Sequence, residues 1–256
     1  MRFPDSFADS FPGLLRSEAR LVFAALAAAV SLIACEPAVP DPSAAREPAV
    51  PNRAPAESEA SAPEPDSRST VVFLGNSLTA GLGVDPREAF PARIQVKIDD
   101  ARLSFRVINA GVSGETTAGG LRRLDWILDQ APQVVVIALG ANDALRGAPP
   151  AAVRTNLQQM IDRTRARLPK TSIVIVGMLA PPNLGPTYTR EFQDVFPALA
   201  EANDLPFIPF LLEGVAANPE LNQTDGMHPT AAGHEILAET VWKVLEPVLR
   251  RPEQNP

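Results

Sequence analysis

Short apolar runs alternate with helical segments through most of this chain, and this alternation restricts the fold more than any other feature. The apolar runs are rich in β-branched residues and lie at 71–74, 105–108, 134–139 and 173–176. Runs of this length and composition are typical of parallel strands that are buried on both faces. Helices are expected between and after them, at 86–102, 117–130, 153–168 and 237–248. The alternation predicts an α/β sandwich with a mainly parallel sheet.

The amino-terminal region has the features of a signal sequence. Residues 21–33 form an apolar run, which is shorter than the roughly 20 residues that a membrane-spanning helix needs. The run leads into Leu-Ile-Ala-Cys, which ends at Cys35, the only cysteine of the chain. This ending resembles the lipobox of bacterial lipoproteins, in which the cysteine is lipidated. We expect residues 1–35 to be a signal peptide that ends at a lipidated Cys35, with an ordinary signal peptide or a buried cysteine as the alternative.

Residues 36–69 are rich in Pro, Ala, Glu and Ser. A segment with few bulky apolar side chains cannot bury enough surface to offset chain entropy, and proline keeps it extended. We therefore expect a disordered tether here, followed by one folded domain at 70–250 and a short tail at 251–256. The expected protein is exported, membrane-anchored through its lipid, faces the periplasm or the cell exterior, and is a monomer.

Composition excludes several classes of function. The chain carries a formal charge of −7, which argues against nucleic-acid binding, because proteins that bind nucleic acid usually present a basic patch. One cysteine and two histidines are too few for a zinc site built from Cys and His ligands, which normally has three or four of them. We therefore predict no metal, no other cofactor and no nucleic-acid partner.

Ser77 follows the first apolar run, within Gly-Asn-Ser-Leu at residues 75–78. Parallel α/β sheets bind ligands outside the carboxyl ends of their strands, so a serine at this place is a candidate nucleophile. Taken alone, the stretch is also ordinary turn chemistry. A nucleophilic serine needs an imidazole that accepts its proton and a carboxylate that orients this imidazole.

His228 and Asp225 offer these two groups from one short loop, Asp-Gly-Met-His-Pro. With Ser77 they give the chain order Ser, Asp, His, which some serine hydrolases use. The other histidine, His234, has no carboxylate placed to orient it. We expect a structural or surface role for His234.

Acyl transfer passes through a tetrahedral oxyanion, and donors aimed at that oxygen are commonly the largest catalytic contribution. The backbone N–H of Ser77 is one candidate donor. Gly114, in the loop after the second apolar run, allows close backbone approach, and Asn142, after the third run, offers a side-chain amide. Both also have structural interpretations, since Gly114 can serve backbone freedom alone and Asn142 can close a turn before the next helix. Glu115 is expected to be a solvated loop carboxylate.

Four blocks of this sequence resemble the SGNH hydrolases, also called the GDSL esterase/lipase family. In chain order the blocks are 75–78, Gly114, Gly-Ala-Asn-Asp at 140–143 and Asp-Gly-Met-His-Pro at 225–229. Residues 109–116 and 142–147 are most similar to the bacterial thioesterase I, lysophospholipase and arylesterase group. The resemblance implies a three-layer α/β/α sandwich of the flavodoxin-like type. It also implies a catalytic triad and an oxyanion hole: Ser77, Asp225 and His228 for the triad, and Ser77, Gly114 and Asn142 for the hole.

Asn76 departs from the family pattern, which usually has aspartate before the serine. That aspartate is not a triad member, and asparagine can still accept a hydrogen bond in the turn, so we expect catalysis to survive. The proline-rich segment 179–188 resembles the substrate-side loop of the thioesterase group. It is expected either to shape an acyl pocket or to seal the edge of the sheet.

The expected function is that of a serine esterase that forms an acyl-enzyme on Ser77. Its expected substrates are carboxylic esters or thioesters, namely aryl esters, short and medium acyl esters, and lysophospholipids. A first alternative is an O-acetylesterase that acts on carbohydrates or the cell wall. A second alternative, of a different class, is a non-catalytic lipoprotein that uses the same cleft to bind a ligand.

Overall fold

The computed structural model describes residues 67–251. The predicted signal peptide, the lipidation of Cys35 and nearly all of the predicted tether lie outside the described residues. Among residues 67–251, no helix combines the length and the apolar character that crossing a membrane requires.

Within the described residues, five parallel strands form one sheet in the order β2-β1-β3-β4-β5. The strands are β1 (Ser69–Gly75), β2 (Phe105–Gly111), β3 (Val134–Ala138), β4 (Ser172–Val176) and β5 (Phe207–Ile208). β1 and β3 lie at the centre and are buried along nearly their whole length, because helices cover both of their faces. The parallel sheet predicted from the sequence is confirmed, whereas the two-residue β5 has no counterpart in the prediction.

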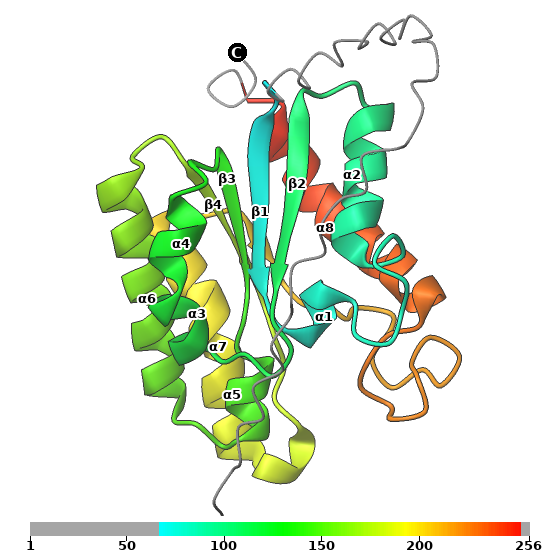
Figure 1. Ribbon diagram of the computed structural model, residues 1–256. Helices are drawn as coiled ribbons and strands as arrows, with labels where there is room; N and C mark the ends of the chain where they lie inside the picture. Colours follow the sequence, from blue (N-terminus) through cyan, green and yellow to red (C-terminus); the bar gives the residue numbers. More distant parts are fainter. Residues whose placement is uncertain (1–66, 252–256) are drawn as a thin grey trace, which may run out of the picture. The chain divides into compact units, whose positions relative to one another are not determined.

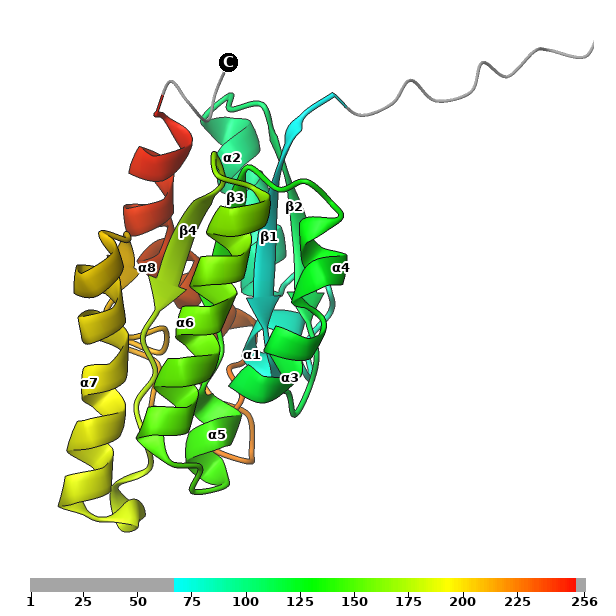
Figure 2. The ribbon, with the colours of Figure 1, turned by 90° about the vertical axis from the view of Figure 1, so that its left-hand side faces the viewer.

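Helices cover both faces of the sheet and give the described part of the chain three layers (Figure 1, Figure 2). On one face, α2 (Phe90–Asp100) packs against α8 (Ala231–Leu249). The other face carries α3 (Thr117–Arg122), α4 (Leu124–Leu128), α6 (Pro150–Arg167) and α7 (Pro186–Asn203). Three short helices complete the fold: α1 (Ser77–Ala80), α5 (Ala141–Leu145) and the 3₁₀ helix η1 (Pro182–Leu184). The three-layer α/β/α sandwich is therefore confirmed.

The helices differ from the prediction most clearly in the following places. The helix expected over 86–102 begins only at Phe90, because a turn closed by the N–H of Glu88 and the carbonyl of Asp85 precedes it. The helix expected over 117–130 is interrupted at Arg123, whose φ of −102° and ψ of 7° end α3 and start α4. α7 begins at Pro186, inside the segment that we expected to be a loop.

The three neighbouring strands β2, β1 and β3 end level with one another. Gly75, the last residue of β1, is paired with Gly111 of β2 and with Ala138 of β3. Because the strands are parallel, the loops that follow them leave the sheet at the same edge. This register brings the loops that carry Ser77, Gly114 and Asn142 together at the end of the sheet where α1 and α5 lie (Figure 1).

Candidate active site

Ser77, His228 and Asp225 form a continuous line of hydrogen bonds at this edge of the sheet. Ser77 is the first residue of α1, and its Oγ lies 2.9 Å from Nε2 of His228. Nδ1 of His228 lies 2.6 Å from Oδ2 of Asp225. An ionised carboxylate only accepts hydrogen bonds, so the imidazole proton is on Nδ1, and Nε2 accepts a hydrogen bond from the serine hydroxyl. The structure thus brings Ser77 together with a loop that lies about 150 residues later in the sequence.

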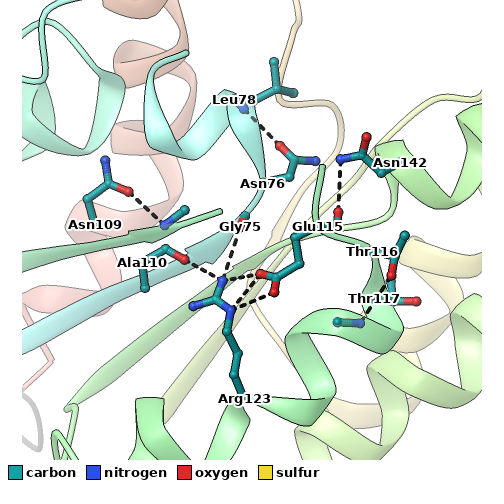
Figure 3. Close-up of polar contacts among 12 residues, drawn as sticks. Gly75, Asn76, Leu78, Asn109, Ala110, Glu115, Thr116, Thr117, Arg123 and Asn142 are labelled. Carbon is teal, nitrogen blue, oxygen red and sulfur yellow. Dashed lines mark hydrogen bonds and ion pairs between the residues drawn. The ribbon is translucent and has the colours of Figure 1, made fainter. Parts of the chain in front are cut away.

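Asn76 shapes the turn that carries Ser77. Its Oδ1 accepts a hydrogen bond from the N–H of Leu78 at 3.0 Å (Figure 3), and its carbonyl accepts hydrogen bonds from Thr79 and Ala80 at 3.1 and 2.9 Å. The expectation that asparagine acts as a hydrogen-bond acceptor in this turn is confirmed. Its Nδ2 is buried and has no hydrogen-bond partner among the described residues.

The loop that carries Asp225 and His228 is fastened at both ends. Before it, the N–H of Gln223 donates to the carbonyl of His228 at 2.7 Å. The side chain of Gln223 also donates to the carbonyl of Leu82 at 2.7 Å, which ties this loop to the chain that follows α1. After it, the hydroxyl of Thr230 accepts the N–H of Gly233 and caps the start of α8. The position of the imidazole is therefore set by contacts on both sides.

Asp225 is held as an ionised carboxylate. Its Oδ1 accepts the backbone N–H groups of Met227 and His228 at 2.9 and 3.0 Å, and its Oδ2 faces the imidazole. The backbone N–H of His228 contributes most, and with the imidazole and the N–H of Met227 it holds the pKa of Asp225 well below its usual range. The carboxylate therefore keeps its charge over the pH range of ordinary assays.

Gly114 and Asn142 border the same cavity as Ser77. Gly114 has a φ of +79°, which glycine adopts without the strain that other residues incur. A Cβ at this position would approach only Nη2 of Arg146, at 3.9 Å, so backbone conformation and not crowding requires the glycine. Nδ2 of Asn142 donates to the carbonyl of Glu115 at 3.0 Å. An amide carries two N–H groups, so one of them remains for the cavity.

Glu115 is not the solvated loop carboxylate that the sequence led us to expect. Its side chain is 8% exposed and forms an ion pair with Arg123, whose side chain is 21% exposed. Nε of Arg123 lies 2.8 Å from each carboxylate oxygen (Figure 3). No pattern in the sequence indicates this pair, because Arg123 sits where the expected helix is interrupted.

An apolar cavity of about 640 Å³ opens beside Ser77 and His228. Large apolar side chains line it, among them Leu78, Leu82, Leu145, Met178, Leu179 and Leu212. Of these, Leu82, Leu145 and Leu179 are 46%, 54% and 41% exposed. The segment 179–188 divides between two roles, since its first residues line the cavity and its last residues begin α7.

His234 lies in α8, away from the line of hydrogen bonds at Ser77. Its side chain is fully buried, and Nδ1 accepts the N–H of Phe90 at 3.3 Å. Burial, assisted by the charge of Arg93, lowers the pKa of His234 to about 4. Of the structural or surface role expected for this histidine, its burial leaves the structural one. Among residues 67–251, no group of three or more His, Cys, Asp and Glu side chains is arranged to hold a metal ion.

Comparison with known proteins places this arrangement in a family. The GDSL-like lipase/acylhydrolase family model matches residues 73–236. The esterase TesA of Pseudomonas aeruginosa is 40% identical over 181 residues, which are 70% of this chain and 89% of that protein. The thioesterase 1/protease 1/lysophospholipase L1 of Escherichia coli (strain K12) is 33% identical over 181 residues, 70% of this chain and 85% of that protein.

A solved structure agrees with these matches. The psychrotrophic esterase EstA from Pseudoalteromonas sp., in a structure inhibited by monoethylphosphonate, has a TM-score of 0.67 and is 32% identical, over 72% of this chain and 100% of that chain. The residues matched by the family model run from β1 into α8 and include both the line of hydrogen bonds from Ser77 to Asp225 and the loops of Gly114 and Asn142. The chain therefore belongs to the GDSL-like lipase/acylhydrolase family.

Proposed function

We propose that Ser77 is the nucleophile of this protein, with His228 as its general base and Asp225 as the carboxylate that orients the base. The observation that carries the proposal is the line of hydrogen bonds from Oγ of Ser77 through the imidazole to Asp225, at 2.9 and 2.6 Å. Its relatives are named as an esterase and a thioesterase/lysophospholipase. The protein is accordingly a carboxylic ester hydrolase.

The geometry supports a two-step reaction. Nε2 of His228 takes the hydroxyl proton while Oγ of Ser77 attacks the ester carbonyl, and the imidazolium that forms is stabilised by the charge of Asp225. The N–H groups of Ser77 and Gly114 and the amide of Asn142 stabilise the oxyanion. The imidazolium then protonates the leaving alcohol or thiol. Water, activated by the same imidazole, hydrolyses the acyl-enzyme and releases the acid.

The cavity supports substrates with an apolar acyl or aryl part. Leucine and methionine side chains around Ser77 bury apolar surface favourably, but they offer few partners for sugar hydroxyls, which a specific carbohydrate site would have to bind. We therefore assign acyl esters, thioesters, aryl esters and lysophospholipids as substrates, in preference to O-acetylated carbohydrates.

The test uses the full chain with p-nitrophenyl esters and acyl thioesters of graded length. Ser77→Ala removes nearly all hydrolysis, and an organofluorophosphonate labels the wild-type protein but not this variant. His228→Ala slows the labelling. Unchanged hydrolysis by Ser77→Ala would remove the proposed nucleophile and favour a non-catalytic cleft that binds its ligand.

We further propose that the protein is exported, anchored to a membrane through a lipid on Cys35, and active as a monomer. The apolar run at 21–33 and the Leu-Ile-Ala-Cys sequence at 32–35, which overlaps its end, support the anchor. Cys35→Ser should move the protein from the membrane fraction to the soluble fraction. Size-exclusion chromatography of the released protein should give the mass of one chain, and a larger mass would reject the monomer.

A further inference from the structure

Arg123 binds the ends of two strands and the loop that follows the second (Figure 3). Nη2 of its guanidinium lies 2.6 Å from the carbonyl of Ala110 in β2 and 3.4 Å from the carbonyl of Gly75, the last residue of β1. The same guanidinium forms the ion pair with Glu115, in the loop after β2. One side chain thus links the strand that leads into Ser77 with the loop that carries Gly114.

Glu115 connects this guanidinium with both candidate oxyanion donors outside α1. It directly follows Gly114, in a turn that the N–H of Glu115 closes by donating to the carbonyl of Val112 at 3.1 Å. Its own carbonyl accepts the hydrogen bond from Nδ2 of Asn142 at 3.0 Å. The place of Glu115 therefore determines where the N–H of Gly114 and the amide of Asn142 point.

The pair has little freedom to move. The side chain of Glu115 is almost fully buried and that of Arg123 largely so. α3 closes the other side, because a Cβ on Gly119 would come within 3.0 Å of Cγ of Glu115. A guanidinium presents its donors in a rigid planar fork that suits a carboxylate and neighbouring carbonyls at once, whereas the compact ammonium of lysine does not.

The interruption between α3 and α4 places Arg123 where it can form these contacts. A continuous helix was expected over 117–130, but the chain leaves helical geometry at this one residue. From this place its side chain reaches the ends of β1 and β2.

We propose that Arg123 and Glu115 are a positioning pair that holds Gly114 and Asn142 at the correct places relative to Ser77. The inference rests on the proposed function, in which these two donors stabilise the oxyanion. Neither side chain of the pair is among the described residues that line the cavity. The pair therefore acts through the donors and not on the substrate itself, and its loss lowers kcat more than it changes KM.

The first experiment replaces Arg123 by methionine in the full chain. The matched control is Arg122→Met, because Arg122 is the exposed neighbour in α3. With p-nitrophenyl butyrate we expect Arg123→Met to lower kcat about 10- to 100-fold and to change KM by less than about twofold. Arg123→Lys, which keeps the charge but not the fork, should lie between this variant and the wild type. The control should keep the wild-type values.

The kcat of each variant is corrected for the fraction of protein that is folded and active. Circular dichroism gives the folded fraction, and titration with a fluorophosphonate gives the number of active sites. If the loss in Arg123→Met disappears after this correction, or appears in KM alone, the proposal is overturned. If Arg123→Met does not fold, Glu115→Gln takes its place, because it keeps the size of the side chain and weakens only the ion pair. It should lower kcat in the same direction by a smaller factor, and a wild-type kcat in this variant also overturns the proposal.

The second experiment combines Arg123→Met with Asn142→Ala. If the pair acts partly through Asn142, the fold-loss of the double variant is smaller than the product of the two single losses. A loss equal to that product overturns the positioning role and leaves the proposed function intact. Full kcat in Asn142→Ala alone overturns the oxyanion role of Asn142, and with it the positioning role that rests on it. Ser77→Ala is measured in the same series, to check that the activity which remains in the other variants comes from Ser77.

Discussion

Asp225 and His228 are joined twice, once through their side chains and once through the backbone. Oδ2 of Asp225 faces Nδ1 of His228 at 2.6 Å, while Oδ1 accepts the backbone N–H of the same histidine at 3.0 Å. The carboxylate is thereby fixed by the loop whose imidazole it orients. The tautomer of His228 is set within four consecutive residues, and only the approach to Ser77 depends on the rest of the fold.

Replacing Asp225 with asparagine should remove most of the activity. The amide oxygen can still accept the backbone N–H groups, but the imidazole loses the acceptor that fixes its proton on Nδ1. We expect kcat to fall about 10³- to 10⁴-fold with little change in KM, measured by steady-state hydrolysis of a p-nitrophenyl ester. Asp194→Asn, on an exposed part of α7, serves as the control. A loss smaller than tenfold would contradict the role of Asp225.

The pH profile of the wild type should show one ionisation on its acid side. The pKa of Asp225 is lowered by the N–H of His228, its imidazole and the N–H of Met227, so this carboxylate gains no proton in the working range. Activity should fall with falling pH because the proposed general base must be free of its proton to accept the proton of Ser77. The logarithm of kcat/KM, measured between about pH 4 and 8, should have a limiting slope of one. A slope of two would mean that Asp225 titrates as well.

His234 should make the fold less stable in mild acid. Its pKa is about 4 in the fold and about 6.5 in an unfolded chain. As the pH falls from about 6.5 to about 4, the unfolded state takes up a proton that the folded state does not, so the free energy of unfolding decreases, by on the order of 2 kcal/mol. Above about pH 6.5 the residue has no such effect.

His234→Asn removes this titration and keeps an acceptor for the N–H of Phe90. Urea denaturation gives the free energy of unfolding of both proteins over this pH range. As the pH falls, this free energy should decrease more in the wild type than in the variant. The carboxylates of the chain titrate in both proteins and cancel in the difference. Parallel curves would show that burial does not keep His234 neutral.

Asn76→Asp should leave a working enzyme. A carboxylate oxygen can accept the N–H of Leu78 as Oδ1 of the asparagine does, so we expect kcat within about tenfold of the wild type. Asn76→Ala removes the acceptor and should lower the free energy of unfolding by about 1 kcal/mol. Thermal denaturation and steady-state kinetics of both variants give the measurement. Complete loss of activity in Asn76→Asp would show that the turn depends on the amide nitrogen.

The sheet and the meeting of the polar loops were predictable from the sequence, because parallel strands buried on both faces leave a continuous apolar signal. β1, β3 and β4 all fall within two residues of the predicted runs. Once the strands are parallel, the loops after them must lie at one edge. The residues predicted for the site do surround one cavity there: Ser77, Gly114, Asn142 and His228 line it, and Asp225 bonds to His228.

Other features depend on tertiary contacts that leave no local pattern. β5 is two residues long and is defined only by its pairing with Ile175 and Val176 of β4. α7 starts at a proline, which the sequence presents as part of a proline-rich loop, although proline is favourable in the first turn of a helix. The ion pair between Glu115 and Arg123 needs both the turn after β2 and the interruption of the helix, so its burial follows only from the assembled fold.

The proposed nucleophile and its proposed base come from opposite ends of the folded sequence. Ser77 is made early, directly after β1, whereas His228 is held against it by a loop that α8 anchors, and α8 packs on α2 through contacts that include His234 and Phe90. A ribosome therefore adds Ser77 about 150 residues before His228, at a time when the last helix of the described fold does not exist. A fragment that ends before Asp225 lacks the proposed base and the carboxylate that orients it, so the proposed function predicts that such a fragment does not hydrolyse esters.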